Sequence, residues 1–540
     1  MHARTLARII LFLGLTLAIA PSLPASPEST PLRTETPVWS SAFIDTIGVN
    51  AHFSFAHSLD HDSTESVING LQTLGVRHIR QSLAPTAKAK IAEATALGIK
   101  LDVPIDLCVT GLPKGAEGEP GRNPGINSAG YAGDSYFTPE AWFAALDANI
   151  GLNHVDAIEE CNEPNGPGNG GYDHQWQTDV PLQAAAFQPV VHTHGLKFIA
   201  PAFAINNLNA PFETPAPHGE KPNFHEQNGV PYAHLSTGTN IAALFDFQNI
   251  HIYPPRWPGF SESGQEMNAA AIIRAFNASV NTTKIPYWAT ETGWSHDPHD
   301  GIWWVPLKIQ TRWINLMLLD HFQLGIARTY IFNDIDESPY LGKVFAHDGL
   351  LTYTVDATNE PGGSPTGGAS PTLEYTSLEN FIHLLRDPAP SYHTTPVSYA
   401  ISGNASKLRW LLLQKSNGLN LLAIWKNDED YIPSVAPTTQ TERTIASNQI
   451  TVTVTETPGH PNNTAVASTF TETGGFLNKA IGARDCGGNH CFNLSVDTHL
   501  TVLQIGPTGF SPETPVPSPT PFGSAIPTPT PAAPLVSLPH

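Results

Sequence analysis

The sequence has little charge, and positive charge is its scarcest kind. Charged residues make up 14% of the 540-residue chain, and 27 Lys and Arg stand against 48 Asp and Glu, which gives a net charge of −21. A typical globular protein carries about 25% charged residues. Nucleic-acid binding requires a basic patch that meets the phosphates, and the sequence shows none. We therefore expect no nucleic-acid partner.

Long apolar runs, glycine periods and heptad repeats are also scarce, which excludes a multi-span membrane protein, a collagen and a coiled coil. The one long apolar stretch covers residues 9–20; Arg4 and Arg8 precede it, and a small-residue site follows near Ala25. This pattern predicts a secretory signal peptide over residues 1–25, with an uncleaved anchor as the alternative. We expect a secreted, periplasmic or cell-surface protein without a membrane span in the mature chain.

Cysteine is scarce as well: the chain has four. Four cysteines are too few for a disulfide scaffold, although an exported protein can hold disulfides. Cys486 and Cys491 bracket a short Gly-containing loop and are expected to pair. Cys108 and Cys161 lie at the ends of neighbouring predicted strands, where they either pair or remain buried thiols. A four-cysteine zinc site is not expected, because the two pairs lie in different predicted domains.

Core-forming residues are plentiful, with 40% hydrophobic and 9% aromatic residues, and a chain of this length favours two domains. Between residues 43 and 386, short apolar runs alternate with amphipathic segments. The runs cover residues 47–53, 76–82, 99–107, 155–161, 197–202, 247–253, 285–292 and 328–333. The amphipathic segments cover residues 63–74, 85–97, 139–150, 181–194, 265–280, 306–324 and 375–385.

Eight buried strands, most of them followed by a helix, predict an α/β fold of the (β/α)₈ TIM barrel type over residues 43–386. A doubly wound sheet is the alternative, but no Gly-rich phosphate loop follows the first strand. Further short runs at 409–414, 419–425, 450–455 and 500–505 then predict a C-terminal all-β sandwich domain over residues 387–506. Residues 26–42 are expected to form an N-terminal linker, and the Pro/Thr/Ser-rich residues 507–540 a disordered tail.

Two glutamates stand where predicted barrel strands end. Glu163 follows the fourth run, and Glu291 lies at the end of the seventh. Strands four and seven lie on opposing sides of a barrel mouth, so the two carboxylates are expected to face each other. A retaining glycosidase needs such a pair about 5–5.5 Å apart, one to attack the anomeric carbon and one to donate and recover a proton. The alternative is that each is a helix cap or a surface ion-pair partner.

These segments resemble a known group of enzymes. Residues 162–164, Asn-Glu-Pro, resemble the signature of clan A retaining glycoside hydrolases, and the extension to Asn165 resembles family 39 and its relatives. Residues 291–294, Glu-Thr-Gly-Trp, are similar to nucleophile segments of several clan members, including cellulase-like ones. The resemblance covers the predicted barrel and implies that Glu163 is the acid/base and Glu291 the nucleophile.

The resemblance also implies roles for residues on other strands. Asn162 would bond the 2-hydroxyl of the sugar, Tyr253 in a His-x-Tyr segment would bond the nucleophile, and Arg80 would keep that carboxylate ionised. Arg77, of the other strand parity, is the rival of Arg80. His251 is either a sugar contact or a structural histidine.

His52 at the end of the first strand has the same two interpretations. Trp294, Trp303 and Trp304 follow strand seven and are expected to stack on sugar rings, with buried core positions as the alternative. The His/Asp-rich residues 295–301 could bind a metal, but a solvated loop is the preferred interpretation. No cofactor is expected, because retaining hydrolysis needs no metal.

The sequence therefore predicts a secreted retaining glycoside hydrolase that cleaves β-glycosidic bonds in a poly- or oligosaccharide through a covalent glycosyl-enzyme. The carbohydrate substrate is the one partner expected. Two alternatives stay open: a noncatalytic carbohydrate-binding or cell-surface protein on the same fold, and a transglycosylase with the same catalytic pair.

Overall fold

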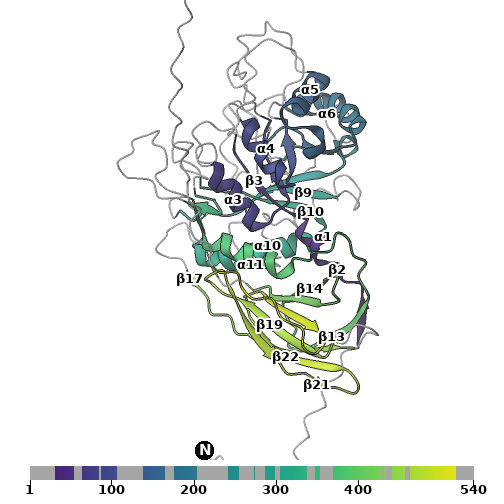
Figure 1. Ribbon diagram of the computed structural model, residues 1–540, viewed down its shortest axis with the longest axis vertical. Helices are drawn as coiled ribbons and strands as arrows, with labels where there is room; N and C mark the ends of the chain where they lie inside the picture. The colour runs from purple at the N-terminus through teal and green to yellow at the C-terminus, as the bar shows by residue number, and fades with distance from the viewer. Residues whose placement is uncertain are drawn as a thin grey trace, which may run out of the picture.

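The computed structural model shows a (β/α)₈ barrel above a β-sandwich, with helices α10 and α11 between them (Figure 1). The residues that the structure describes are 31–53, 64–83, 87–105, 138–163, 176–202, 241–253, 273, 286–297, 304–336, 347–352, 369–428, 431–432, 441–455 and 462–517. Within these residues, no helix has the length and apolar character needed to cross a membrane.

The barrel is one eight-stranded parallel sheet with the strand order β7-β6-β5-β4-β3-β10-β9-β8. Its strands are β3 (Ile47–Asn50), β4 (His78–Arg80), β5 (Lys100–Pro104), β6 (Val155–Glu159), β7 (Lys197–Ile199), β8 (Gln248–Ile252), β9 (Tyr287–Thr292) and β10 (Ile326–Ile331). A parallel bridge between Ile199 and Phe247 joins the two end strands and closes the barrel. All eight runs predicted as strands are strands, and the predicted fold class is confirmed.

Six of the predicted helices are present. They are α3 (Thr64–Leu74), α4 (Lys88–Ala96), α5 (Pro139–Asn149), α6 (Trp176–Thr193), α10 (Leu307–Gln323) and α11 (Leu373–Leu385). Local chemistry fixes two of the starts: the Thr138 side chain caps α5 by accepting from the N–H of Ala141, and Thr372 caps α11 in the same way. The expected helix at 265–280 lies outside the described residues except for Ile273.

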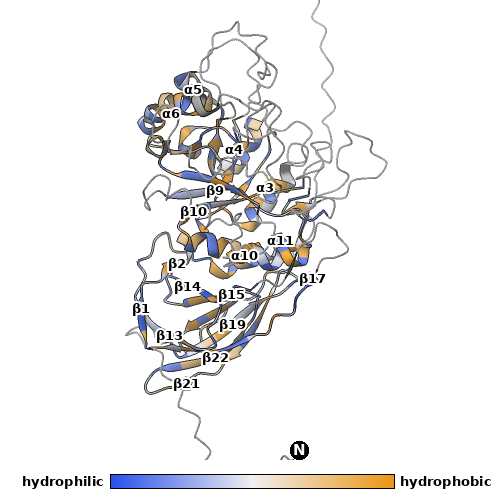
Figure 2. Cartoon of the chain, turned by 180° about the vertical axis from the view of Figure 1, so that it is seen from behind, coloured by the Kyte–Doolittle hydropathy of each residue, from blue (hydrophilic) through white to orange (hydrophobic). Residues whose placement is uncertain are grey.

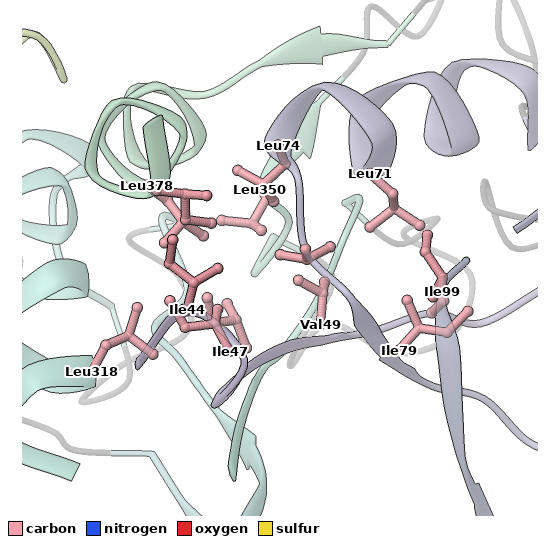
Figure 3. Close-up of a cluster of buried hydrophobic side chains, with 14 of the residues drawn as sticks. Ile44, Ile47, Val49, Leu71, Leu74, Ile79, Ile99, Leu318, Leu350 and Leu378 are labelled. Atoms are coloured by element: carbon pink, nitrogen blue, oxygen red, sulfur yellow. The ribbon is translucent and has the colours of Figure 1, made fainter. Parts of the chain in front are cut away.

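Successive residues of a barrel strand point alternately outward and inward, which gives the barrel an apolar outer face and a polar interior. On β3, Ile47 and Val49 point outward and gather with Leu74 of α3 and Leu378 of α11 in one apolar cluster (Figure 3). Gly48, between them, faces inward, where an added Cβ would lie 2.4 Å from the ring of Tyr330. Only glycine fits there, and the bulky side chains of the barrel interior can close over it.

The sandwich consists of a five-stranded sheet, β1-β13-β18-β22-β21, and a six-stranded sheet, β2-β14-β15-β23-β19-β20. Its longer strands are β13 (Val397–Gly403), β14 (Leu408–Gln414), β15 (Asn420–Lys426), β18 (Asn448–Val454), β19 (Thr464–Phe470), β20 (Phe476–Ile481), β22 (His490–Val496) and β23 (Thr501–Gly506). The shorter ones are β1 (Arg33–Glu35), β2 (Val38–Trp39) and β21 (Arg484–Asp485).

Both ends of the folded chain differ from expectation. Strands β1 and β2 lie in the segment expected to be a linker, and they pair with β13 and β14 of the sandwich before helix α1 (Ser40–Ile44) leads into the barrel. The first residues of the expected tail are also held in place. The N–H of Val516 donates to Asn380 Oδ1 on α11, and Lys415 forms an ion pair with Glu513.

Helix α10 connects the two domains. In Figure 2, α10 and α11 lie between the barrel strands and the sandwich strands, and both carry hydrophobic residues. The residues of α10 from Ile309 to His321 are all buried, as expected for a helix that is covered on every side. Arg312 of α10 reaches Glu442 and Glu472 of the sandwich segment. The barrel and the sandwich therefore share a packed interface.

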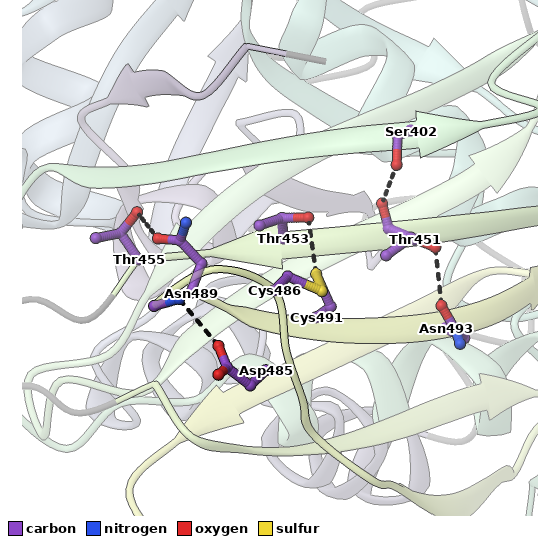
Figure 4. Close-up of a disulfide and its surroundings, with 10 residues drawn as sticks. Ser402, Thr451, Thr453, Thr455, Asp485, Cys486, Asn489, Cys491 and Asn493 are labelled. Atoms are coloured by element: carbon purple, nitrogen blue, oxygen red, sulfur yellow. Dashed lines mark hydrogen bonds between the residues drawn. A yellow bond between two sulfur atoms is a disulfide. The ribbon is translucent and has the colours of Figure 1, made fainter. Parts of the chain in front are cut away.

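The predicted disulfide between Cys486 and Cys491 is present beside β22, where Thr453 contacts the sulfur of Cys491 (Figure 4). Cys161 is disulfide-bonded as well, and Cys108 lies outside the described residues.

Candidate active site

Polar side chains gather at the C-terminal ends of the barrel strands. The two predicted carboxylates are among them: Glu163 lies just beyond β6, and Glu291 lies on β9. The backbone of Glu163 has a φ of 41°, in the left-handed region that non-glycine residues seldom adopt. A hydrogen bond of 3.0 Å from its N–H to the carbonyl of Ala202, beyond β7, holds this conformation.

A β-bulge aims Glu291 into the barrel. On the neighbouring strand β8, Ile250 pairs with Ala289 but His251 pairs with Glu291, so Thr290 is an extra residue on β9. Ala289 packs with Ile250 on the outer face, whereas Thr290 bonds to groups in the interior. Strict alternation would then turn Glu291 outward. The bulge reverses the alternation, and both Thr290 and Glu291 face the interior.

The two carboxylates are close together. A ligand atom from each of Glu163, His251 and Glu291 lies within 4.8 Å of the other two, so one oxygen of Glu163 and one of Glu291 are at most that far apart. His251 lies between them, with Nδ1 2.9 Å from Glu163 Oε1 and 3.4 Å from Glu291 Oε2. A retaining carboxylate pair is about 5–5.5 Å apart, whereas an inverting pair is about 6.5–9.5 Å apart. The geometry fits the retaining arrangement.

Arg80 of β4 organises the site from below. Its five N–H groups match five acceptors: two bonds go to Glu159 (2.6 and 3.0 Å), and one each goes to Glu291 (2.8 Å), Asn162 (2.7 Å) and Asn50 (3.1 Å). This arrangement uses the full donor capacity of a guanidinium group. The rival Arg77 is 46% exposed and 3.6 Å from Asp45, so the structure favours Arg80.

The surroundings favour an ionised Glu291. Burial alone would raise the pKa of this carboxyl, but the charges of His251 and Arg80 and the hydrogen bond from Tyr253 hold the pKa below its ordinary value. The Tyr253 hydroxyl donates to Glu291 Oε2 at 2.6 Å. Burial and the neighbouring Glu291 raise the pKa of Tyr253 well above its usual range, so this donor keeps its proton.

His251 is the second positive group of the site. Burial opposes its charge, but Glu291 and Glu163 raise its pKa above the ordinary value. Its Nε2 lies 3.0 Å from Thr290 Oγ1, so both ring nitrogens have partners. A charged imidazole between two carboxylates reduces their mutual repulsion.

A polar layer lies under the carboxylates, and it was not predicted from the sequence. Asn249 donates to Glu159 Oε1 at 2.9 Å, and Asn50 donates to the carbonyl of Thr290 at 2.9 Å. Burial and the charge of Glu159 raise the pKa of Asp102 well above its usual range. The signal was present in the sequence: each of these polar residues interrupts a buried strand at an inward position.

The tryptophans predicted to stack on sugar rings lie in different environments. Trp294 is 2% exposed and packs against Trp313 of α10, so its predicted role in sugar stacking is wrong. Thr292 points outward, because its side chain contacts Met317 of α10. Trp294 lies two residues later and points the same way, so its indole lies in the core between the barrel and α10. Trp304 is half-buried and donates from Nε1 to the carbonyl of His296 at 2.8 Å. Trp303 lies outside the described residues.

His52 lies at the site, where its charge contributes to the low pKa of Glu291. The rings of His52 and Phe332 are arranged edge to face, with their centroids 5.2 Å apart, and the ring of Phe332 also contacts that of Tyr253. An aromatic ring from the end of β10 thus stands beside the carboxylates. The loops at 112–137 and 203–230, which the sequence marks as elaborated, lie outside the described residues.

Comparisons with known proteins give structural relatives. No family model matches the chain, and no curated protein matches it. A family 51 α-L-arabinofuranosidase from Bifidobacterium longum is similar with a TM-score of 0.46 and 12% identity, over 89% of this chain and 98% of that one. A GH30 endoxylanase from Clostridium papyrosolvens is similar with a TM-score of 0.43 and 10% identity, over 86% and 96%.

A third solved structure is a β-1,3-glucanosyltransferase mutant from Rhizomucor miehei, with a TM-score of 0.35 and 17% identity over 60% of this chain and 97% of that one. At these scores the likeness carries no inference about activity, which rests on the geometry of the site. The sheet topology of this chain confirms the (β/α)₈ fold that the clan A resemblance implies, and the structures similar to it include glycoside hydrolases.

Proposed function

We propose that the protein is an exported retaining glycoside hydrolase that cleaves β-glycosidic bonds in a poly- or oligosaccharide. The observation that supports this most strongly is the pair of carboxylates within 4.8 Å of each other at the C-terminal mouth of the barrel. Their surroundings are unequal: Glu291 has Arg80 and Tyr253 as partners, whereas the side chain of Glu163 has His251 as its partner among the described residues.

The unequal surroundings assign the two roles. Glu291, held ionised, attacks the anomeric carbon, and the bond between that carbon and the leaving oxygen breaks. Glu163 donates its proton to the leaving oxygen, so the departing sugar carries a hydroxyl group. In the second step Glu163 takes a proton from water, the water oxygen bonds to the anomeric carbon, and the ester to Glu291 breaks. Two displacements retain the β configuration.

Asn162 has a distinct place in this scheme. Its side-chain oxygen accepts from Arg80 at 2.7 Å, which fixes the orientation of the amide next to the acid/base candidate Glu163. We propose that this amide donates to the 2-hydroxyl of the bound sugar, a contact that strengthens in the transition state.

The stereochemistry of the first product tests the proposal. We expect turnover of at least one aryl β-glycoside or β-linked polysaccharide, and proton NMR of the early reaction should show the β anomer forming first, before mutarotation. An α anomer as first product, or no turnover across a broad panel, would contradict the retaining assignment. Added sugar acceptors separate the two reaction types, because a transglycosylase yields longer oligosaccharides where a hydrolase yields the free sugar.

Replacing Tyr253 with Phe should shift the pH profile. The change removes the hydroxyl that stabilises ionised Glu291, so the pKa of Glu291 rises toward its ordinary value. Because the nucleophile must be ionised, the acidic limb of kcat/KM should move to higher pH. A hydrogen bond to a charged group contributes about 1.5–3 kcal/mol, so kcat/KM should fall about 10- to 100-fold.

Tyr375→Phe is the matched control for this experiment. Tyr375 is a buried tyrosine of α11 whose hydroxyl donates to the carbonyl of Gly70 at 2.7 Å, outside the barrel mouth. Loss of this hydroxyl should lower the stability of the protein and leave the acidic limb of the kcat/KM profile unchanged. Equal pH profiles for Tyr253→Phe and the unmodified protein would mean that Tyr253 does not tune the nucleophile.

A further inference from the structure

A second cluster of metal-ligating side chains lies on the rim of the barrel. His296 follows β9, Asp336 follows β10, and His347 precedes β11 (Leu351–Thr352). One ligand atom from each lies within 4.8 Å of the other two. The imidazole rings are 5.6 Å apart between centroids, and His296 Nε2 is 3.4 Å from Asp336 Oδ2. His296 thus meets two residues that lie 40 or more positions later in the chain.

The backbone holds this cluster in place. The N–H of His296 donates to the carbonyl of His347 at 2.9 Å, and the N–H of Gly349 donates to Asp336 Oδ1 at 3.0 Å. The second bond leaves Asp336 Oδ2 directed at His296. A Cβ at position 349 would lie 2.0 Å from the N of Asp336, so the close approach of these loops requires glycine. Trp304 donates from its side-chain N–H to the carbonyl of His296 and so also holds the backbone of His296 in place.

Burial and charge give an independent indication. Asp336 is 6% exposed, and the ion pairs of the described residues give it one partner, the imidazole of His296. A buried carboxylate needs a positive partner or a metal. A further carboxylate, Asp297, lies 3.3 Å from His347 Nε2, so among the described residues two carboxylates lie beside the two imidazoles. A divalent cation would balance these two negative charges.

We propose that His296, Asp336 and His347 bind a divalent transition metal, with Zn²⁺ as the best match, and that this metal joins the segment after β9 to the segments after β10. Two imidazoles and a carboxylate are ligands that zinc accepts, whereas Ca²⁺ and Mg²⁺ prefer oxygen ligands throughout. The role is structural, since the site contains neither of the catalytic carboxylates. This proposal does not depend on the glycosidase assignment.

The catalytic cluster is a poorer site for the cation. Glu163, His251 and Glu291 are equally close to one another, but the guanidinium of Arg80 lies 2.8 Å from Glu291 Oε1 and repels a second positive charge. Among the described residues, the ion-pair partner of Asp336 is His296, and no arginine or lysine pairs with it. The sequence favoured a solvated loop at 295–301 because Asp336 and His347 lie far along the chain from His296.

Zinc titration of the untagged full chain, freed of metal with EDTA and desalted, tests this site. We expect saturable 1:1 binding by calorimetry, an increase in Tm with Zn²⁺, no increase with equal Ca²⁺, and a visible absorption band with Co²⁺. His347→Gln and Asp336→Asn should each weaken zinc binding by about 100-fold or more and remove the cobalt band. Asp336→Asn keeps the side-chain oxygen that accepts from Gly349, so it guards against misfolding.

Two controls locate the metal. His192→Ala removes the imidazole of another His–Asp pair, 3.0 Å apart, and should leave zinc affinity unchanged. Glu291→Gln should also leave it unchanged, because the metal would lie outside the catalytic pair. Absence of saturable zinc binding, full affinity in His347→Gln, or loss of affinity in Glu291→Gln would each overturn the proposal.

Discussion

Replacing Glu291 with Gln is expected to lower kcat/KM by about 10⁴-fold or more, the scale on which loss of a covalent nucleophile acts in other enzymes. The amide is nearly isosteric with the carboxylate but cannot form the ester to the anomeric carbon. It also lacks the charge that Arg80 and His251 stabilise. Steady-state kinetics with an activated aryl glycoside, at matched circular dichroism and Tm, measures the effect.

Glu163→Ala is expected to give a different pattern. Loss of the acid/base slows substrates with poor leaving groups by about 10²- to 10⁴-fold, whereas activated leaving groups depart without protonation. Azide attacks the glycosyl-enzyme without base assistance, so added azide should restore activity on activated substrates and release a β-glycosyl azide. Glu291→Gln should show no such rescue, because it forms no intermediate.

Glu379→Gln serves as the control for both changes. Glu379 is a buried glutamate of α11, and burial raises its pKa to about 7. Its amide variant should therefore keep full activity near pH 6. Undiminished turnover in Glu291→Gln would refute the role of Glu291 as nucleophile. Azide rescue of Glu291→Gln in place of Glu163→Ala would reverse the two assigned roles.

The barrel was predictable because its signal is local. Short runs rich in apolar residues alternate with amphipathic segments along the chain, and the alternation of outer and inner faces can be read directly on β3, where Ile47 and Val49 face outward. In the sandwich, the four predicted runs correspond to β14, β15, β18 and β23, whereas the long strands β13, β19, β20 and β22 were missed. In β20 (Phe476–Ile481), the apolar Phe476 and Leu477 are adjacent, and so are the polar Asn478 and Lys479, so this strand has no alternating apolar pattern.

The short strands β1 and β2 were missed for another reason. Two or three residues carry no periodicity, and their structure comes from pairing with β13 and β14, more than 360 residues away in sequence. Tertiary pairing of this kind overrides local propensity. The same segment therefore looked like a linker.

The candidate site was predictable in its members and less so in its geometry. The strand-end positions of Glu163, Glu291 and Tyr253 follow from the order of the runs. The inward direction of Glu291 depends on the bulge at Thr290, and no sequence pattern marks that bulge. The same limit explains Trp294: its outward direction depends on how the chain leaves β9, and proximity to a motif does not fix the direction of a side chain.

Replacing Arg80 with Ala is expected to lower the free energy of unfolding by about 3–5 kcal/mol, the usual cost of removing one partner of a buried ion pair. Five acceptors lose their donor at once, and Glu159, which is fully buried, loses its two charge-assisted bonds. Urea unfolding at pH 7, with the m-value checked, measures this loss. Arg77→Ala is the matched control: Arg77 is half-exposed, and its loss should cost at most about 1 kcal/mol.

The pH dependence of the Arg80 variant separates this explanation from simple loss of packing. Without the guanidinium, burial raises the folded-state pKa of the Glu291 carboxyl above the unfolded value of about 4.3. Carboxyls with a raised pKa favour the folded state while they are protonated, and that contribution is lost as the pH rises through the raised pKa. The Arg80→Ala penalty should therefore be smaller at pH 5 than at pH 8. A penalty independent of pH would indicate a cavity effect. Arg80→Lys should recover little of the loss, because an ammonium group has three donors for five acceptors.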